Sequence, residues 1–116
     1  MPSVRQVLGA WGEEAATRWY REQGYEIVAR NWRAGRGELD LVAATSGVLV
    51  VCEVKTRRGT SHGSAFDAVT HDKQRRVRRL AMAFLDAHPT HRGRRLRFDV
   101  AAVSRDGSVD VLESAF

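Results

Sequence analysis

Two neighbouring stretches of the chain place charged side chains beside apolar runs. "GELDLVAA" carries Glu38 and Asp40, and "VLVVCEVKTR" carries Glu53 and Lys55. Residues two apart on a strand point to the same face, so each pair of charges shares one side of a sheet. A charge beside buried residues is costly unless it is paired or binds a metal ion. These four residues are therefore the first candidates for chemistry.

A short hairpin would bring the two stretches together. With a two-residue turn at "SG", Thr45 pairs with Val48, and the same antiparallel register sets Asp40 opposite Glu53. Opposed side chains lie about 5 Å apart, so two carboxylates there repel each other. A divalent cation between them would remove this repulsion, and oxygen ligands favour Mg²⁺, with Mn²⁺ as the second choice. The alternative is an ion-pair patch in which Lys55 neutralises both carboxylates.

The chemistry of such a metal site would be hydrolysis. Metal binding lowers the pKa of a coordinated water molecule, which makes that water a nucleophile at neutral pH. Lys55, on the same face, could position the water or stabilise charge on a phosphate group. This combination predicts a phosphodiester hydrolase.

The rest of the chain supplies elements that can hold these residues in place. Ser3 and Gly24 mark the two ends of a helix, and an i, i+3, i+4, i+7 apolar spacing marks a second helix. In chain order we expect a helix at 4–23, strands at 25–32, 38–44 and 48–55, a loop at 57–66, a helix at 70–87, and strands at 96–103 and 108–116. The expected apolar face of the first helix carries Leu8, Trp11, Ala15 and Trp19.

This element order predicts an α/β fold. Three consecutive strands with short connections must pair antiparallel, and two long helices can cover the faces of their sheet. With 116 residues the chain has the size of one domain, spanning 1–116. We therefore expect a mixed β-sheet flanked by two long helices, in the order α-β-β-β-α-β-β.

Charge and hydropathy narrow the class of partner. The formal net charge is +5, the sequence pI is about 10.3, and the basic residues cluster in "KTRRG", "KQRRVRR" and "HRGRRLR". Such clusters are typical of proteins that bind a phosphate backbone, with a solvated charged face as the alternative. No apolar run approaches the roughly 20 residues of a membrane helix. We expect a cytoplasmic protein with no membrane part, whose single cysteine, Cys52, is buried in an apolar strand.

Only two of the 19 basic residues are lysines, Lys55 and Lys73. In a chain that otherwise uses arginine, a compact ammonium group suggests a specific site. Lys73 lies at the start of the second helix, where it can hold a phosphate or extend into solvent. Four arginines on that helix or just past the charged strand are expected to contact the phosphate backbone: Arg57, Arg58, Arg76 and Arg79.

Several ordered motifs give the chain a family resemblance. "ELDLVA" followed by "VCEVKTR" resembles the PD-(D/E)xK nuclease signature, although Leu39 stands where the superfamily name has a proline. With "GEEAATRWYREQGYEIVARNWR" and "AVTHDKQRRVRRLAMAFL", these motifs resemble the YraN-like family of predicted endonucleases, related to archaeal Holliday junction resolvases. The resemblance spans about residues 8–103. It implies a restriction-endonuclease-like α-β-β-β-α-β core, in agreement with the expected element order.

The resemblance also implies roles for individual residues. Asp40 and Glu53 would bind Mg²⁺ together with the backbone carbonyl of Val54, and Lys55 would be the catalytic lysine. Glu13, in "GEEAA", resembles the helix-borne glutamate of the resolvases. Because Glu13 lies at the edge of the apolar stripe of its helix, a solvated carboxylate is the alternative.

The resulting hypothesis is a metal-dependent endonuclease that hydrolyses DNA, with double-stranded or branched, Holliday-junction-like DNA as its substrate. A nucleic-acid-binding module with the same fold but no turnover is the alternative from another functional class. A nuclease that acts on RNA, or only with a partner, is a third alternative. That partner would be a second copy of the chain in a homodimer, or another protein.

Overall fold

Helices and strands follow the chain in the predicted order. The computed structural model describes residues 1–57 and 63–116. Its elements are α1 (Val4–Glu22), β1 (Glu26–Ala34), β2 (Gly37–Ala44), β3 (Val48–Arg57), α2 (Gly63–Asp67), α3 (His71–Ala87), the 3-10 turn η1 (Pro89–His91), β4 (Arg95–Ser104) and β5 (Val109–Leu112). The predicted α/β class, with a mixed sheet and two long helices, is confirmed.

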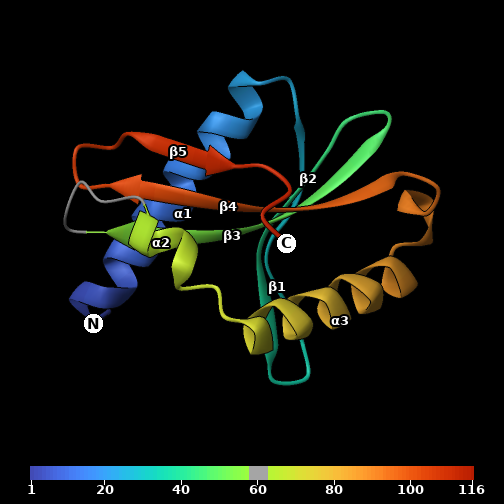
Figure 1. Ribbon diagram of the computed structural model, residues 1–116, viewed down its shortest axis with the longest axis horizontal. Coiled ribbons are helices and arrows are strands. Elements are labelled where there is room, and N and C mark those ends of the chain that lie inside the picture. The colour runs from blue at the N-terminus through green and yellow to red at the C-terminus, as the bar shows by residue number, and fades with distance from the viewer. Residues whose placement is uncertain (58–62) are drawn as a thin grey trace.

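The five strands form one sheet in the order β1-β2-β3-β4-β5. β3 and β4 pair in parallel, whereas all other neighbours pair antiparallel. A parallel pair needs a long crossover, and α2 and α3 belong to it. In Figure 1, the β1–β2 hairpin runs downward while β3 and β4 run across the view, so the sheet opens between β2 and β3.

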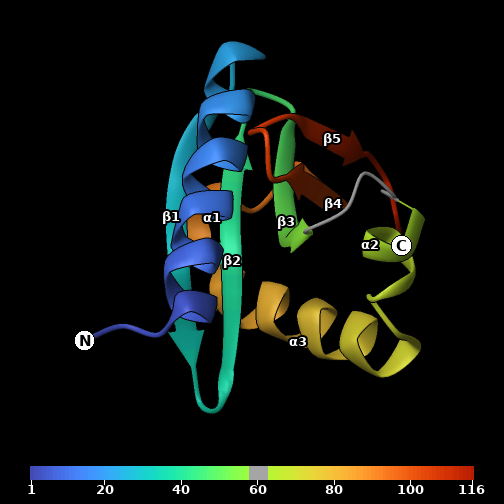
Figure 2. The same cartoon turned by 90° about the vertical axis from the view of Figure 1, so that its left-hand side faces the viewer.

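Each face of the sheet has its own apolar core. The cluster on the α3 side contains Val51 and Phe84, and the cluster on the α1 side contains Tyr20 and Cys52. Figure 2 shows α1 lying along β1 and β2, with α3 on the far side of the sheet. Val51 and Cys52 are adjacent in β3, so this central strand is buried from both faces up to Glu53.

The N-terminal end of α1 is set by a reciprocal cap. The Ser3 hydroxyl accepts a hydrogen bond from the Gln6 N–H (3.1 Å), and the Ser3 N–H donates to the Gln6 side chain (2.8 Å). At the other end Gly24 has φ +91°, a conformation that glycine adopts without strain. Both predicted ends of the helix are therefore close to the observed ones.

The buried face of α1 is shifted from the predicted one, toward Gly12, Ala16 and Tyr20. The large residues of the expected face are only half-buried: Leu8, Trp11 and Trp19. Small residues such as Gly12 and Ala16 are fully buried instead, because the helix backbone lies close to β3. The Thr56 hydroxyl donates a hydrogen bond to the main-chain carbonyl of Leu8, one helical turn before Gly12 (3.3 Å).

Gly12→Ala is expected to destabilise the fold by about 1–3 kcal/mol. A Cβ at Gly12 would overlap with Thr56 Oγ1, so α1 would have to move away from β3. Gly9→Ala is the matched control, because a Cβ at Gly9 meets nothing within 4 Å and alanine favours the helix by about 1 kcal/mol. Urea unfolding measures both changes; equal stability of the two variants would contradict the close packing of α1 on β3.

A buried polar network ties α1 to β4. Asp99 accepts a hydrogen bond from the Tyr20 hydroxyl (2.7 Å) and two from the Arg97 guanidinium (both 2.9 Å). The Ser114 N–H donates a further hydrogen bond to Asp99 (3.1 Å). Because both oxygens of this buried carboxylate have partners, we assign Asp99 to the scaffold rather than to a reactive site.

Two details of the predicted elements are wrong. The expected loop at 57–66 overlaps with the short helix α2, which begins at Gly63. Residues 58–62 of this loop lie outside the described residues. β5 ends at Leu112 instead of continuing to residue 116. Ser114 causes this early end, since its φ of +51° is incompatible with a strand and its N–H donates to the Asp99 side chain rather than to a main-chain carbonyl of β4.

Cys52 is completely buried in β3, as predicted. Burial raises the pKa of its thiol, as do the nearby carboxylates Asp99 and Glu53. Within the described part of the chain, no helix is long and apolar enough to cross a membrane.

Candidate active site

The β2–β3 hairpin has the predicted register. Leu41 pairs with Cys52, and the pairing continues in step toward the turn. The pairing of β2 with β3 ends at Leu41 and Cys52, where the two strands separate in Figure 1. The next residues along the two strands, Asp40 and Glu53, therefore lie where the sheet opens rather than inside a continuous ladder.

Asp40 takes the place of a strand partner for β3. Its Oδ2 accepts a hydrogen bond from the Val54 N–H (2.9 Å), which satisfies a main-chain donor beyond the end of the β2–β3 ladder. Burial raises the pKa of the Asp40 carboxyl, against the lowering effect of that hydrogen bond and of the Lys73 and Lys55 ammonium groups. The carboxylate is thus held in one position by the strand that carries the other charged residues.

Glu53 is the most deeply buried carboxylate of the site, with 2% of its surface exposed. Its Oε1 lies 3.7 Å from the Lys73 ammonium nitrogen, whereas Oε2 has no hydrogen-bond partner. Burial, followed by the charge of Asp40, raises the pKa of Glu53 to about 7. An unpartnered buried carboxylate oxygen is costly and is typical of a site that binds a ligand or ion.

Both lysines of the chain lie at these carboxylates. Burial, together with the nearby ammonium of Lys73, lowers the pKa of Lys55 to about 8, although Glu53 and Asp40 act in the opposite direction. Lys73 comes from the first turn of α3, where its N–H donates to the capping Thr70 hydroxyl (3.3 Å). Its side chain turns inward to Glu53, in contrast to the alternative of a solvated side chain, and its contact with a phosphate stays a prediction.

A second carboxylate pair adjoins the first. The Asn31 amide donates to Glu13 Oε2 (2.9 Å) and to Glu38 Oε1 (2.7 Å) in the orientation that satisfies its neighbours. Burial and the charge of Asp40 raise the pKa of Glu13. Glu38 also lies 3.5 Å from the Arg33 guanidinium. Glu13 therefore faces the acidic site across Asn31, in contrast to the alternative of a solvated helix carboxylate.

Asn31 is the residue that sequence reasoning missed. Its φ of +52° is unusual for a residue other than glycine, and such strain is concentrated at functional sites. The signal is present in the sequence: an asparagine inside the strand-forming run "YEIVARNW" is disfavoured in a regular strand and tolerates positive φ.

The donor set fits a hard divalent cation. Half-buried Asp40 and buried Glu53 provide carboxylate oxygens, and the unpartnered Oε2 of Glu53 offers a free ligand atom. In residues 1–57 and 63–116, no three His, Cys, Asp or Glu side chains converge to hold a metal ion. Two carboxylates would thus be supplemented by main-chain oxygen, water or substrate, and a role for the Val54 carbonyl stays a prediction.

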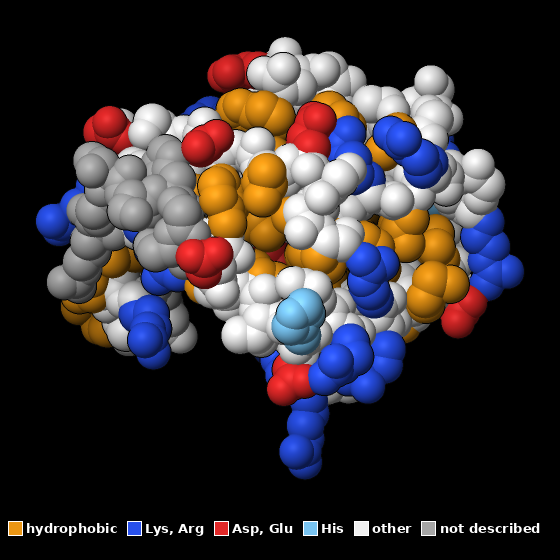
Figure 3. All heavy atoms as spheres, in the orientation of Figure 1, with side chains coloured by type: hydrophobic (Ala, Val, Ile, Leu, Met, Phe, Trp, Pro, Cys, Tyr) orange, Lys and Arg blue, Asp and Glu red, His pale blue; other side chains and the backbone are white. Residues whose placement is uncertain are grey.

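The described arginines among those expected to contact nucleic acid lie on β3 and α3. Arg57 is half-buried at the end of β3, and Arg58 lies outside the described residues. Arg76 and Arg79 are exposed on α3 and, with Arg36, line a groove of about 610 Å³ beside the β1–β2 turn. In the space-filling view a hollow separates the left-hand part of the molecule from the lower part, and Lys and Arg side chains lie on both sides (Figure 3).

The candidate site residues lie in the part of the chain that is similar to known proteins. The sequence model of Uncharacterised protein family UPF0102 matches residues 12–103. A UPF0102 protein of Parafrankia sp. (strain EAN1pec) is 50% identical over 110 residues, which cover 93% of this chain and 92% of the relative. A UPF0102 protein of Rhodococcus jostii (strain RHA1) is 53% identical over 97 residues, covering 84% and 81%. One of Acidothermus cellulolyticus is 42% identical, with 98% of this chain and 96% of the relative covered.

Proposed function

The chain belongs to Uncharacterised protein family UPF0102, the YraN-like family indicated by its motifs, and we propose that it is a metal-dependent endonuclease that hydrolyses DNA phosphodiester bonds. The observation that carries this proposal is the Glu53 carboxylate, which is buried with an unpartnered oxygen beside Asp40 and both lysines. A scaffold has no need for this arrangement, since apolar residues would fill the same space at lower cost.

Each residue of the site has a separate role in the proposed hydrolysis. Asp40 and Glu53 would hold Mg²⁺ or Mn²⁺, and the bound cation supplies Lewis-acid activation of water and of the phosphate. The Val54 N–H fixes the orientation of Asp40. Lys55 would donate hydrogen bonds to the phosphate oxygens, where negative charge develops during attack.

Lys73 and Glu13 act on the carboxylates rather than on the substrate in this scheme. The Lys73 ammonium offsets the charge of buried Glu53, which limits the cost of keeping that residue ionised. Glu13, held by Asn31, adds negative charge next to Asp40 and would strengthen the attraction for a cation. Glu38 contributes to the same field from β2.

Double-stranded or branched DNA is the proposed substrate class. The site lies at an opening of the sheet, and arginines lie at the end of β3 and along α3, which favours recognition of the phosphate backbone over reading of base edges. A binding module without turnover is the second candidate. The position of Lys73 favours it, because an ammonium group already supplies part of the charge that a cation would bring to Glu53.

The two candidates differ in the effect of metal. We expect the purified protein to cleave a labelled four-way junction, a flap or a plain duplex with Mg²⁺ or Mn²⁺, and to cleave none of them in EDTA. Asp40→Asn is expected to abolish cleavage while the unfolding transition is retained, because it removes one of the two carboxylates of the cation site.

Asp86→Asn is the matched control for that substitution. Asp86 is exposed near the C-terminal end of α3, roughly 20 Å along the helix from Lys73, so cleavage should stay at the wild-type rate. Tight junction binding with no cleavage under any metal condition would contradict the nuclease and support the binding module. Undiminished cleavage by Asp40→Asn would contradict the assigned site.

A further inference from the structure

The groove of about 610 Å³ between the β1–β2 turn and α3 has a basic rim. Its three exposed arginines come from two elements, Arg36 from the turn and Arg76 and Arg79 from α3. No Asp or Glu is among the described residues that line it; the others are small or apolar: Ala34, Gly37, Leu80 and Ala83. Three like charges around one groove repel one another, and a bound anion would offset this repulsion.

The arginines of α3 differ in their partners within the chain. Arg75 forms an ion pair within the helix, and the Arg78 guanidinium lies 4.7 Å from the centre of an aromatic ring of β4. Within residues 1–57 and 63–116, by contrast, Arg36, Arg76 and Arg79 form no hydrogen bond, ion pair or ring contact. The arginines that line the groove are therefore those whose guanidinium groups can turn to a ligand.

The position of Arg36 is set by the packing of its turn on α3. The pairing of Ala34 with Gly37 leaves a two-residue turn, in which Gly35 has φ +59°. A Cβ added at Gly37 would lie 2.7 Å from Leu80 Cδ1, so the end of the hairpin lies directly against the helix. A short turn in close contact with α3 holds Arg36 beside the two helix arginines before any ligand binds, which lowers the cost of binding.

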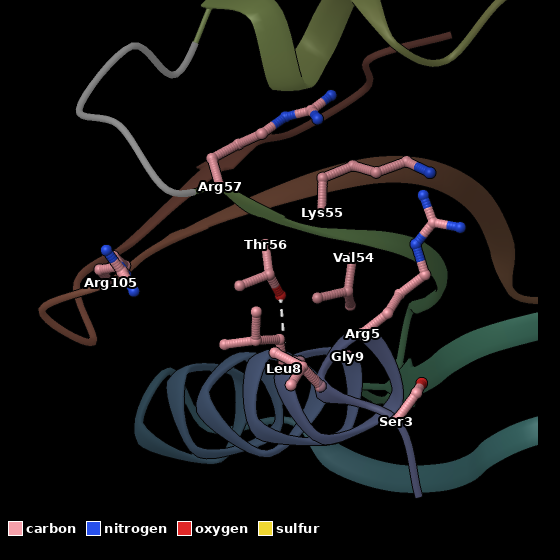
Figure 4. A pocket seen from close by; sticks show the side chains of 10 residues that line it. Ser3, Arg5, Leu8, Gly9, Val54, Lys55, Thr56, Arg57 and Arg105 are labelled. Atoms are coloured by element: carbon pink, nitrogen blue, oxygen red, sulfur yellow. Dashed lines mark hydrogen bonds between the residues drawn. The ribbon is translucent and has the colours of Figure 1, made fainter.

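The groove of about 740 Å³ between α1 and β3 does not gather cations in this way (Figure 4). The side chains of Lys55 and Arg57 project from β3 away from α1. Lys55 also lies within electrostatic reach of Glu53 and Asp40. A phosphate is therefore better accommodated along α3 than between α1 and β3.

The groove on α3 starts close to the carboxylates. Lys73, which lies 3.7 Å from Glu53, precedes Arg76 by three residues, or about 4.5 Å along the helix axis. Arg79 follows after about the same distance again. In Figure 1 α3 crosses the hairpin near the β1–β2 turn, so a backbone bound at the carboxylates can continue along the helix to Arg36.

We propose that Arg36, Arg76 and Arg79 form one binding site for the phosphate backbone of double-stranded DNA, on the α3 side of the cleaved bond. This inference rests on the proposed function and extends it, because it makes the β1–β2 turn part of the DNA-binding surface. A guanidinium group can bind two phosphate oxygens at once, which a compact ammonium group does not do. The basic residues would thus have separate tasks, with lysines at the carboxylates and arginines at the neighbouring phosphates.

The test is the salt dependence of binding without metal. Affinities for a labelled DNA duplex and for an RNA duplex of the same length are measured in EDTA over a range of NaCl concentrations, for the wild type and Arg36→Gln/Arg79→Gln. Each lost phosphate contact reduces the slope of log K against log salt by about 0.9. For DNA we expect the double variant to lose about 1–2 from this slope and about 10-fold in affinity at the lowest salt.

Arg18→Gln/Arg21→Gln is the matched control. Both arginines are exposed on α1, which lies on the other side of the sheet from α3, and the change in net charge is the same. We expect this variant to keep the wild-type slope. Equal effects of the two double variants would overturn the site and leave only a general effect of net charge, and an effect confined to RNA would overturn the assignment to DNA.

Ala83→Leu tests the groove without a change of charge. Ala83 is half-buried at the groove, and a leucine would take up space that the sugar–phosphate backbone needs. We expect about 10-fold weaker DNA binding, with the stability retained because leucine is nearly as good a helix former as alanine. Ala87→Leu, exposed at the end of α3 and outside the groove, should bind as the wild type does. Undiminished binding by Ala83→Leu would count against the site.

The outcomes separate this site from the nuclease. Metal-dependent cleavage that Asp40→Asn abolishes, combined with normal binding by Arg36→Gln/Arg79→Gln, would retain the nuclease and reject the site. Loss of binding specific to the groove variants, in a protein that cleaves nothing, would support the site as part of a binding module. Failure of the wild type to bind the DNA duplex would overturn both.

Discussion

Lys55→Ala is expected to lower metal-dependent DNA cleavage by about 10³-fold, the upper range for removing one group that stabilises charge in a transition state. Lys55 is the ammonium group that shares β3 with Glu53 and lies within electrostatic reach of Asp40. Its lowered pKa, about 8, keeps it mostly protonated at neutral pH but close to the range where proton transfer is efficient. The measurement is the single-turnover cleavage rate at saturating protein.

Two further variants show whether the effect belongs to Lys55 itself. Lys55→Arg keeps the charge but replaces a compact ammonium by a planar fork, so we expect only partial recovery of the rate. Lys73→Ala is expected to lower the rate by about 10-fold, because in the proposed scheme Lys73 offsets the charge of Glu53 and does not contact the phosphate. A wild-type rate in purified Lys55→Ala would remove this residue from the mechanism.

Glu53→Gln is expected to abolish cleavage and at the same time to stabilise the fold by about 2–3 kcal/mol at pH 7 in metal-free buffer. Burial raises the pKa of this carboxyl from 4.5 to about 7. Each pKa unit corresponds to about 1.36 kcal/mol, so ionisation of buried Glu53 opposes folding on the order of 3 kcal/mol. Glutamine has nearly the same shape and carries no charge, and it removes this cost together with a proposed metal ligand.

The pH dependence gives the sign of this effect. Between pH 4.5 and about 7, the unfolded chain has already released the Glu53 proton while the folded chain retains it. The folded state therefore binds more protons in this window, and wild-type stability falls as pH rises through it. The stability difference between Glu53→Gln and the wild type should be small near pH 4.5 and should grow toward pH 7.

Urea unfolding in EDTA at several pH values measures this difference. Glu26→Gln is the control, since Glu26 is exposed on β1 and its substitution should change stability by no more than about 0.5 kcal/mol. A Glu53→Gln variant less stable than the wild type at pH 7 would show that the ion pair with Lys73 outweighs the cost of burial.

Local patterns were sufficient to predict the hairpin that carries the site. The short turn fixes the register, so the observed pair Leu41 and Cys52 follows from the sequence alone, and with it the proximity of Asp40 and Glu53. The cap at Ser3 was equally accessible, because capping depends on residues three positions apart. These features need no knowledge of the rest of the fold.

Contacts between distant segments could not be predicted in this way. Lys73 meets Glu53 only because α3 packs across the sheet at one particular angle, which helical periodicity does not determine. Asp40 bonds to the Val54 N–H because β2 leaves β3 at this point, whereas the register alone predicts that Asp40 simply faces Glu53. The contact of Asn31 with Glu13 and Glu38 likewise depends on how α1 lies against β1 and β2.

The buried thiol of Cys52 can be used to measure motions of the sheet. Cys52 is the single cysteine, has no exposed surface, and lies next to Glu53 in the strand at the centre of the sheet. Thiol reagents attack the thiolate, so modification requires this strand to become exposed to solvent. The rate of maleimide labelling of the unaltered protein therefore measures how often the sheet opens at the candidate site, and slower labelling in the presence of a ligand would show that the ligand keeps it closed.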